Sequence, residues 1–180
     1  MLRHLSLRAG LARLPVLALA SLGPLALDPA HALNMPVASR VIAFVQPPLS
    51  GVVTAAIIFE PGNVASEAEA AAIEQEVGNG IAIGRGIIRV RKVPVGTLGS
   101  VPGIRLAFVT AGIHDQQQLS NFAARDGVLT ITSDATCVQA ARCVLSVSDN
   151  ARIQITVSRA AAQASRIHFQ SAFLMLVKER

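Results

Sequence analysis

The chain has 180 residues, a formal net charge of +5 and a hydrophobic content of 52%, and it contains neither Trp nor Tyr. The lack of aromatic platforms argues against a site that stacks single-stranded nucleic acid or sugars. Residues 33–180, which follow the N-terminal segment described next, carry 13 basic and 10 acidic residues, a net charge of +3. This mild excess is not a nucleic-acid footprint, and 148 residues are the size of one ordinary domain.

The N-terminus has the three parts of an export signal. Three arginines and no acid precede the apolar stretch 14–27, and Ala30-His31-Ala32 offers a small-x-small cleavage site. The apolar stretch is shorter than the roughly 20 residues that a membrane-spanning helix needs. We therefore predict a cleaved signal peptide over residues 1–32, with an uncleaved N-terminal anchor as the alternative, and one domain over 33–180.

The first part of this domain alternates between strand and helix patterns. Residues 39–46 are typical of a short helix or strand, and the apolar run 52–59 is typical of a strand covered on both faces. Ser66 stands three residues before Glu69, the spacing of a capping box, which predicts a helix through Val77. The Gly-Asn-Gly turn that follows should end this helix.

The middle of the chain continues the alternation. The segment 87–95 has a β-like pattern interrupted by charges and a proline, which is typical of an edge strand. A linker over 97–103 leads to a buried strand over 104–109. Asp115 is then placed to cap a helix that runs to Arg125.

The last third is predicted as a strand, a hairpin and a helix. A strand over 128–132 precedes a hairpin of 143–147 and 152–157, whose second strand should point Ile153, Ile155 and Val157 inward. An amphipathic helix is expected from Arg159 to about Lys178. The order of elements predicts an α/β fold, a single domain with a mixed β-sheet flanked by helices in a Rossmann-like three-layer sandwich.

The two cysteines of the chain are Cys137 and Cys143. In the oxidising compartment that follows export, two cysteines so close in a segment not expected to be helical are predicted to form a disulfide, with free thiols as the alternative. Closing so small a loop stabilises a fold by about 2–2.5 kcal/mol. We favour a structural bond over a redox switch.

The sequence gives no convincing catalytic or cofactor pattern. Residues 78–84 are glycine-rich, but their spacing departs from a dinucleotide loop and they follow a helix, so we interpret them as a turn. Ser133, His114 and Asp134 would form a triad only if the fold joined them, and no serine lies in a G-x-S-x-G elbow. We interpret His114 as a loop residue and His168 as a half-buried residue of the last helix. No catalytic, cofactor-binding or metal residues are therefore predicted.

A basic cluster is formed in the sequence by Arg85, Arg89, Arg91 and Lys92. We interpret it as a solvated strand edge. The functional alternative is a surface for an acidic partner or for the headgroups of a nearby membrane.

The second half of the chain carries a resemblance to a known family. Residues 103–109 and the later Leu129-Thr130-Ile131-Thr132-Ser133-Asp134 match an apolar strand and an "LTVSD" strand end, and 152–155 with 161–176 match a closing strand and helix. In these motifs the chain resembles the YfiR-like family of bacterial periplasmic proteins. Phe44-Val45-Gln46-Pro47 resembles that family's "FVxWP" segment without its Trp, and Ser158 stands where members often have Asn.

The resemblance implies a periplasmic, non-enzymatic regulator. Such a protein binds the periplasmic part of an inner-membrane diguanylate cyclase and holds the enzyme inactive, which controls cyclic-di-GMP and biofilm formation. The resemblance also allows a homodimer and a redox-responsive Cys137–Cys143 bond like the disulfide of some members. We expect no cofactor and no nucleic acid. The alternative is a periplasmic small-ligand-binding module associated with a transporter or receptor.

Overall fold

The computed structural model describes residues 32–149 and 152–180, so the predicted signal peptide lies outside the described residues except for Ala32. In chain order, the elements are α1 (Met35–Ile42), β1 (Val45–Gln46), β2 (Ser50–Phe59), α2 (Val64–Val77), β3 (Ile81–Ile83), β4 (Arg85–Pro94), the 3-10 helix η2 (Val95–Ser100), β5 (Leu106–Val109), α3 (Gln116–Asp126), β6 (Leu129–Thr132), α4 (Ala135–Gln139), β7 (Leu145–Asp149), β8 (Ile153–Val157), α5 (Arg159–Ala164), β9 (His168–Phe169), α6 (Ser171–Leu174) and β10 (Lys178–Glu179).

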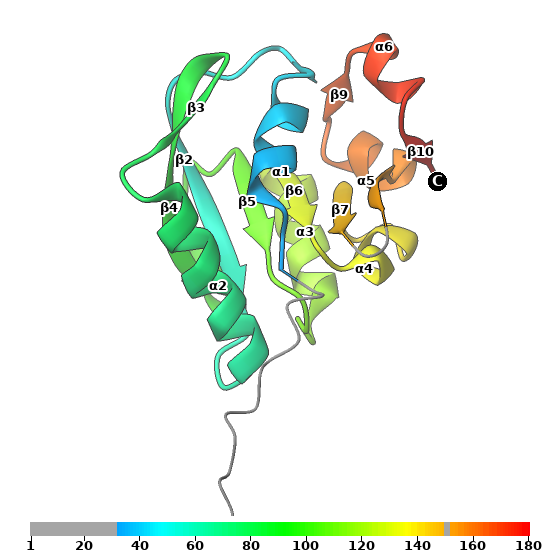
Figure 1. Cartoon of the computed structure of the whole chain (residues 1–180). Helices are drawn as coiled ribbons and strands as arrows, with labels where there is room; N and C mark the ends of the chain where they lie inside the picture. Colours follow the sequence, from blue (N-terminus) through cyan, green and yellow to red (C-terminus); the bar gives the residue numbers. More distant parts are fainter. Residues whose placement is uncertain (1–31, 150–151) are drawn as a thin grey trace, which may run out of the picture.

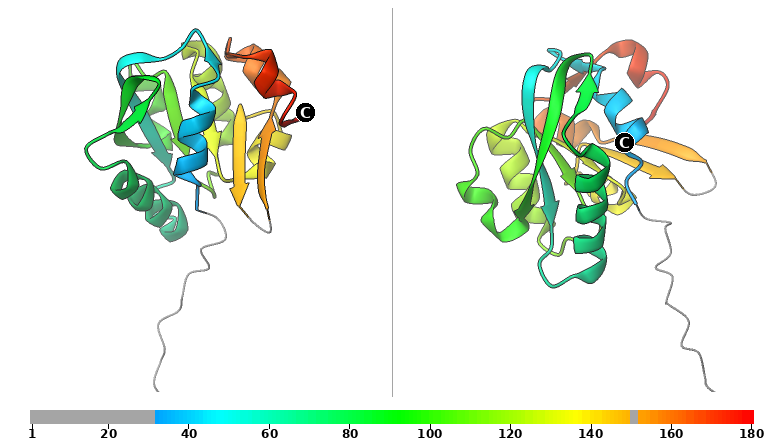
Figure 2. Two further views of the ribbon diagram at one scale, coloured as in Figure 1. Left: turned by 45° about the horizontal axis from the view of Figure 1, so that its top comes forward. Right: turned by 60° about the vertical axis from the view of Figure 1, so that its left-hand side comes forward.

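A mixed sheet of eight strands forms the middle layer, in the order β10-β8-β7-β6-β5-β2-β4-β3. Its central strands β4, β2, β5, β6 and β7 are parallel, while β3 and β8 run antiparallel to their neighbours β4 and β7. Helices cover both faces (Figure 1), and Figure 2 shows α2 and the yellow-green α3 on opposite sides of the sheet. The predicted α/β domain with a mixed sheet flanked by helices is confirmed.

The two faces of the sheet bury two separate apolar cores. One core joins α1, α2, α5 and α6 to the sheet through residues such as Ile57 and Phe108. The other joins η2, α3 and α4 to the opposite face through residues such as Ile58 and Val109. Neighbouring residues of one strand belong to different cores because successive side chains of a strand point to opposite faces.

Strand β2 is covered on both faces only in its second half. Ala55 through Ile58 are completely buried, as the unbroken apolar run predicts, but Val52 is 64% exposed. On the face of η2 and α3 only the carboxyl half of the strand is covered, because these elements pack against Ala56 and Ile58 and not against the residues before them. On the opposite face Val53 is already buried. The prediction was therefore wrong for the beginning of β2.

Strand β4 is second from the edge rather than at it. It lies between β2 and the short strand β3, which the sequence analysis did not predict. β3 pairs with Gly86 through Ile88 only, so the half of β4 from Arg89 to Pro94 forms the edge on that side within the described part of the chain. The charges and the proline that suggested an edge strand lie in this half.

Helix α2 has a different cap from the one predicted. Its N-cap is Asn63, whose Oδ1 accepts from the backbone N–H groups of Ala65 and Ser66. Ser66 is buried inside the first turn, where its Oγ accepts from the N–H of Glu60 at 2.8 Å and lies 2.6 Å from Thr110 Oγ1. The predicted capping box is thus wrong, although the helix does run to Val77 and end at Gly78.

Replacing Asn63 by Ala is expected to lower the free energy of unfolding by about 1–2 kcal/mol, because the first turn of α2 loses its cap. The change also removes the bond from Asn63 Nδ2 to the carbonyl of Gly112. Asn63→Asp keeps the capping oxygen, so it should cost less. Urea unfolding of the three proteins tests this, and equal losses for Ala and Asp would contradict a capping role.

The single long C-terminal helix predicted over 159–178 is wrong. Ser158 caps α5, which ends at Ala164, and Arg166 then takes a positive φ of 55° that breaks the helix. The residues beyond form β9, α6 and β10. His168 lies in β9 and is exposed, and β9 pairs with β1. The apolar residues that suggested one helix form an aromatic cluster instead, in which Phe173 stacks on the ring of Phe44 and packs at a tilt against the ring of Phe169.

Two further segments differ from expectation. The linker over 97–103 begins as part of η2, whose Leu98 is buried. The hairpin of β7 and β8 is present, but Ile153 at its outer end is exposed and Thr156 is buried beside Val157. The helices cover only the inner end of this hairpin, so alternation along β8 does not decide burial at its tip. The strands at 104–109 and 128–132 and the helix capped by Asp115 are confirmed.

Candidate interaction surface

The residues of the hypothetical triad have three different partners. Ser133 Oγ donates to Glu69 Oε1 at 2.8 Å, while Asp134 caps α4 through Thr136. His114 is exposed, with its Nδ1 3.6 Å from Glu60 Oε2. In the described ranges, no group of three or more His, Cys, Asp or Glu side chains is placed to hold a metal ion. The glycine-rich residues 78–84 form the turn and strand between α2 and β4.

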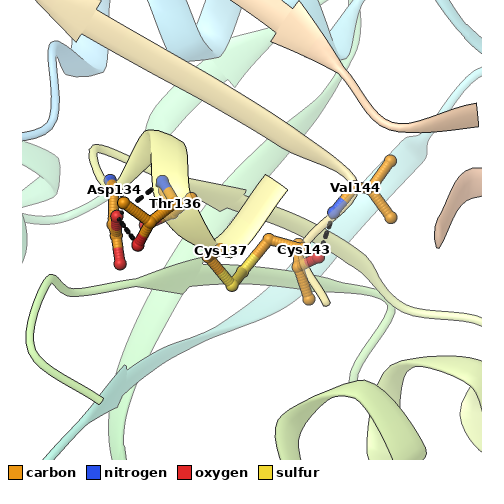
Figure 3. Close-up of a disulfide and its surroundings, with 7 residues drawn as sticks. Asp134, Thr136, Cys137, Cys143 and Val144 are labelled. Carbon is orange, nitrogen blue, oxygen red and sulfur yellow. Dashed lines mark hydrogen bonds between the residues drawn. A yellow bond between two sulfur atoms is a disulfide. The ribbon is translucent and has the colours of Figure 1, made fainter. Parts of the chain in front are cut away.

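The predicted disulfide is present. Cys137 in α4 and Cys143 just before β7 are joined by an S–S bond of 2.00 Å, with their Cα atoms 5.3 Å apart. Figure 3 shows the bond beneath α4, whose N-terminus is capped by Asp134. Cys137 therefore lies in a short helix, contrary to the expectation of a non-helical segment. The bond fastens α4 to the start of β7, where Val144 also donates to Thr130 Oγ1.

Burial favours a structural role for this bond. Cys137 and Cys143 are 2% and 0% exposed and belong to the core formed with α3. Thiol–disulfide exchange requires an attacking thiolate to reach a sulfur atom. A reductant therefore reaches the bond only when α4 moves away from the sheet.

Replacing both cysteines by alanine should lower the free energy of unfolding by about 2–2.5 kcal/mol, because the unfolded chain regains the conformational entropy that closing a loop this short removes. The oxidised protein should also keep its disulfide in reduced glutathione under native conditions and lose it once urea unfolds the chain. Thiol labelling followed by mass spectrometry measures both. Rapid reduction of the native protein would instead support the redox switch.

The basic cluster is divided between the two faces of β4. Lys92 points to the face covered by α2, and its Nζ pairs with Glu74 Oε2 at 2.8 Å. Arg85, Arg89 and Arg91 are exposed on the opposite face. The interpretation as a solvated strand edge holds for Arg89 and Arg91, which lie in the half of β4 that β3 leaves unpaired and are exposed. Their side chains project from the sheet face, so they also form part of an exposed surface. Lys92 does not belong to this exposed surface, because it lies on the other face of the sheet and pairs with Glu74.

This outward face extends across β2. Register pairs Val52 with Ile87 and Thr54 with Arg89, so these side chains lie on one surface. Arg105, just before β5, is exposed and lines a shallow pocket together with Val52 and Thr54, so it adjoins this surface. We call this surface the basic face; its residues are Val52, Thr54, Arg85, Ile87, Arg89, Arg91 and Arg105.

The basic face is open because the covering layer stops short of it. Val93 and Ile58 on the same face are buried under η2 and α3, whereas Val52 and Ile87 are 64% and 47% exposed. Within the described residues, none of the four arginines of the face forms a salt bridge with an acidic side chain. The surface therefore combines unneutralised positive charge with exposed apolar side chains.

A groove of about 1060 Å³ adjoins the basic face at Arg105. It lies at the amino ends of β5 and β6 and is lined by Arg125 and Arg166 among others. Arg125 pairs with Asp126 at 2.7 Å, and its hydrogen bond holds the pKa of Asp126 below the usual value. Asp126 consequently stays ionised and offsets the charge of Arg125, so the groove is less positive than the basic face.

Such a surface is suited to an acidic macromolecule. Complementary charge steers association and fixes orientation, and the apolar side chains supply contact area once water is excluded. The sequence analysis identified three of the four arginines but missed Arg105, Val52 and Thr54. The period-two spacing of residues 85, 87, 89 and 91 was the available signal, because it places Ile87 on the same side as the arginines. The contribution of Arg105 depends on strand order, which the sequence does not display.

The sequence profile of the YfiR/HmsC-like family matches residues 37–178. The chain belongs to this family. The matched range covers the basic face, the groove and the disulfide, and it confirms the resemblance found in the sequence. The family is known for periplasmic regulators of cyclic-di-GMP signalling. No curated protein matches the chain, and among the described residues no helix is long and apolar enough to cross a membrane.

Proposed function

We propose that the protein is a periplasmic, non-enzymatic regulator that binds the periplasmic part of an inner-membrane diguanylate cyclase and keeps that enzyme inactive. The proposal is supported by membership of the YfiR/HmsC-like family and by the predicted signal peptide. The observation that carries it is the basic face, an uncovered sheet surface with four exposed arginines beside Val52 and Ile87.

Inhibition requires only that the regulator bind the inactive state of its target more tightly than the active state. We propose that an acidic region of the cyclase lies on the basic face and that this contact supplies the difference. Charge pairs between exposed groups are screened by salt, with a Debye length of about 8 Å at physiological ionic strength. Binding of the cyclase's isolated periplasmic region should therefore weaken as salt is raised, which titration calorimetry can measure.

Cellular cyclic-di-GMP in a deletion strain tests the function directly. Deletion should raise the nucleotide, and expression of the wild-type protein should restore the original level. The same rise should be absent when the cyclase gene is deleted too. An unchanged level in the single deletion, in cells shown to express the protein beforehand, would rule out the inhibitor.

The groove beside Arg105 favours a second candidate, a module that binds a small anionic ligand. A volume of about 1060 Å³ can accept a ligand of drug size, and guanidinium groups at Arg105 and Arg166 would bind its carboxylate or phosphate. A melting temperature that rises with the concentration of such a compound would support this function. The compound's effect on binding of the cyclase would show whether the two functions are joined.

The homodimer stays a prediction. The most exposed large apolar side chains in the described ranges are Met175 and Leu176, at the end of α6. We propose these as the dimer contact. Sedimentation of the wild-type protein and of the Met175→Ser/Leu176→Ser variant would test it.

A further inference from the structure

The buried carboxylate of Glu69 in α2 accepts a hydrogen bond from the backbone at the start of the predicted mature domain. The backbone nitrogen of Leu33 donates to Glu69 Oε1 at 3.1 Å. Leu33 is 4% and Glu69 8% exposed, so this contact lies in the interior. The same carboxylate accepts from the N–H of Ala111 at 2.7 Å and from Ser133 Oγ at 2.8 Å, residues that follow β5 and β6.

Leu33 is also the first residue after the predicted cleavage site. Hydrolysis of the Ala32–Leu33 peptide bond consumes one water, leaves a carboxylate on Ala32 and leaves an amine on Leu33. That amine takes up a proton at neutral pH, since an α-amino group has a pKa of about 7.7–8.0. Cleavage therefore converts the neutral donor that faces Glu69 into an ammonium with three donor hydrogens.

We propose that the α-ammonium of Leu33 in the processed protein forms a buried ion pair with Glu69. Removal of the signal peptide would then complete the fold, because the new terminus ties α1 to the carboxyl edge of the sheet at Ala111 and Ser133. This inference rests on the predicted cleavage site and does not depend on inhibition of a cyclase.

Two physical arguments support the pair. An ammonium and a carboxylate within hydrogen-bond distance attract each other more strongly than a neutral N–H and a carboxylate do, and burial strengthens that attraction. The donor atom is already in place at 3.1 Å, held by the burial of Leu33 and by α1, whose N-cap Asn34 is the next residue. Ala32 is exposed, so its loss removes no core packing.

The first experiment uses the exported protein purified from cells. Mass spectrometry should find Leu33 as its N-terminus. An amine-acylating reagent should then label Lys178, which is exposed, while the Leu33 amine stays protected until the protein is unfolded. The chain has only two lysines, Lys92 and Lys178, so each amine can be mapped separately. In the folded protein we expect the Leu33 amine to be labelled at least about tenfold more slowly than Lys178. An exposed α-amine would instead react faster than lysine, because it is less protonated at neutral pH.

The second experiment separates the ion pair from simple burial. Glu69→Gln should release the Leu33 amine for labelling, while Glu76→Gln, an exposed change on the same helix, should leave it protected. Acylating the α-amine in urea and refolding the protein should lower the melting temperature by roughly 5 °C in the wild type, within the range expected for loss of a buried charge pair. The same modification should have little effect in Glu69→Gln.

Three results would overturn the proposal. They are an N-terminus other than Leu33, a Leu33 amine that reacts as fast as Lys178 in the folded protein, and an unchanged melting temperature after acylation. All three measurements use the wild-type chain. The test therefore stands even where Glu69→Gln fails to fold for want of the carboxylate's other hydrogen bonds.

Discussion

Replacing Arg89 by glutamate should raise cellular cyclic-di-GMP to nearly the level of the deletion strain. Arg89 lies in the middle of the basic face, paired with Thr54 and flanked in β4 by Ile87 and Arg91. Reversal of its charge turns an attraction for an acidic partner into a repulsion. We expect binding of the cyclase's periplasmic region to weaken by about 10- to 100-fold, which corresponds to roughly 1.4–2.8 kcal/mol.

A matched control distinguishes this effect from a general change of charge. Arg152 is exposed just before β8, which lies near the opposite edge of the sheet from β4. Arg152→Glu changes the net charge equally and should leave inhibition intact. Immunoblotting and thermal melting should find both variants folded and equally abundant. Equal loss of inhibition in the two variants would remove the basic face from the proposed contact.

Replacing Phe108 by alanine should lower the free energy of unfolding by about 3–5 kcal/mol. Phe108 is completely buried in β5, in register with Ile57 of β2 and Ile131 of β6. Truncation leaves a cavity at the middle of the sheet, where strands on both sides prevent collapse. For a domain of this size the melting temperature should fall by roughly 6–20 °C, as calorimetry can measure.

Phe108→Leu is the control for this change, because it retains most of the apolar volume and should cost much less. The alanine variant should also raise cyclic-di-GMP, but through loss of folded protein, since a few kcal/mol alters cellular abundance. At equal folded concentration its affinity for the cyclase should match that of the wild type. A loss below about 1 kcal/mol would mean that the core can close around the cavity.

The central sheet was predictable because local patterns and burial agree there. The apolar runs that became β2, β5 and β6 are short and strongly hydrophobic, and both cores cover most of their residues. The cap at Asp115 and the helix stop at Gly78 depend on neighbouring residues alone. The disulfide followed from the spacing of two cysteines in a chain that the sequence predicts to be exported.

The C-terminal region and most of the candidate site depend on contacts between distant segments. β9 forms only because β1 lies beside it, and Phe173 packs against both Phe169 and Phe44, the latter about 130 residues earlier in the chain. Helical spacing cannot reveal such a partner. Ser66 likewise has the sequence of a cap, yet it bonds to Thr110 across the core. The basic face required the order of β4, β2 and β5, which emerges only when the sheet is assembled.

The short length of β3 has a consequence for handling the protein. From Arg89 onward, β4 presents unpaired backbone groups along one side, where another extended chain could add as a further strand. The guanidinium groups of Arg89 and Arg91 and the ring of Pro94 oppose that addition through mutual repulsion and a missing donor. Neutral substitutions intended to probe recognition at this strand would therefore also promote fibrous self-association. Charge reversal at Arg89 retains a charged, solvated side chain on this strand and is the cleaner way to study it.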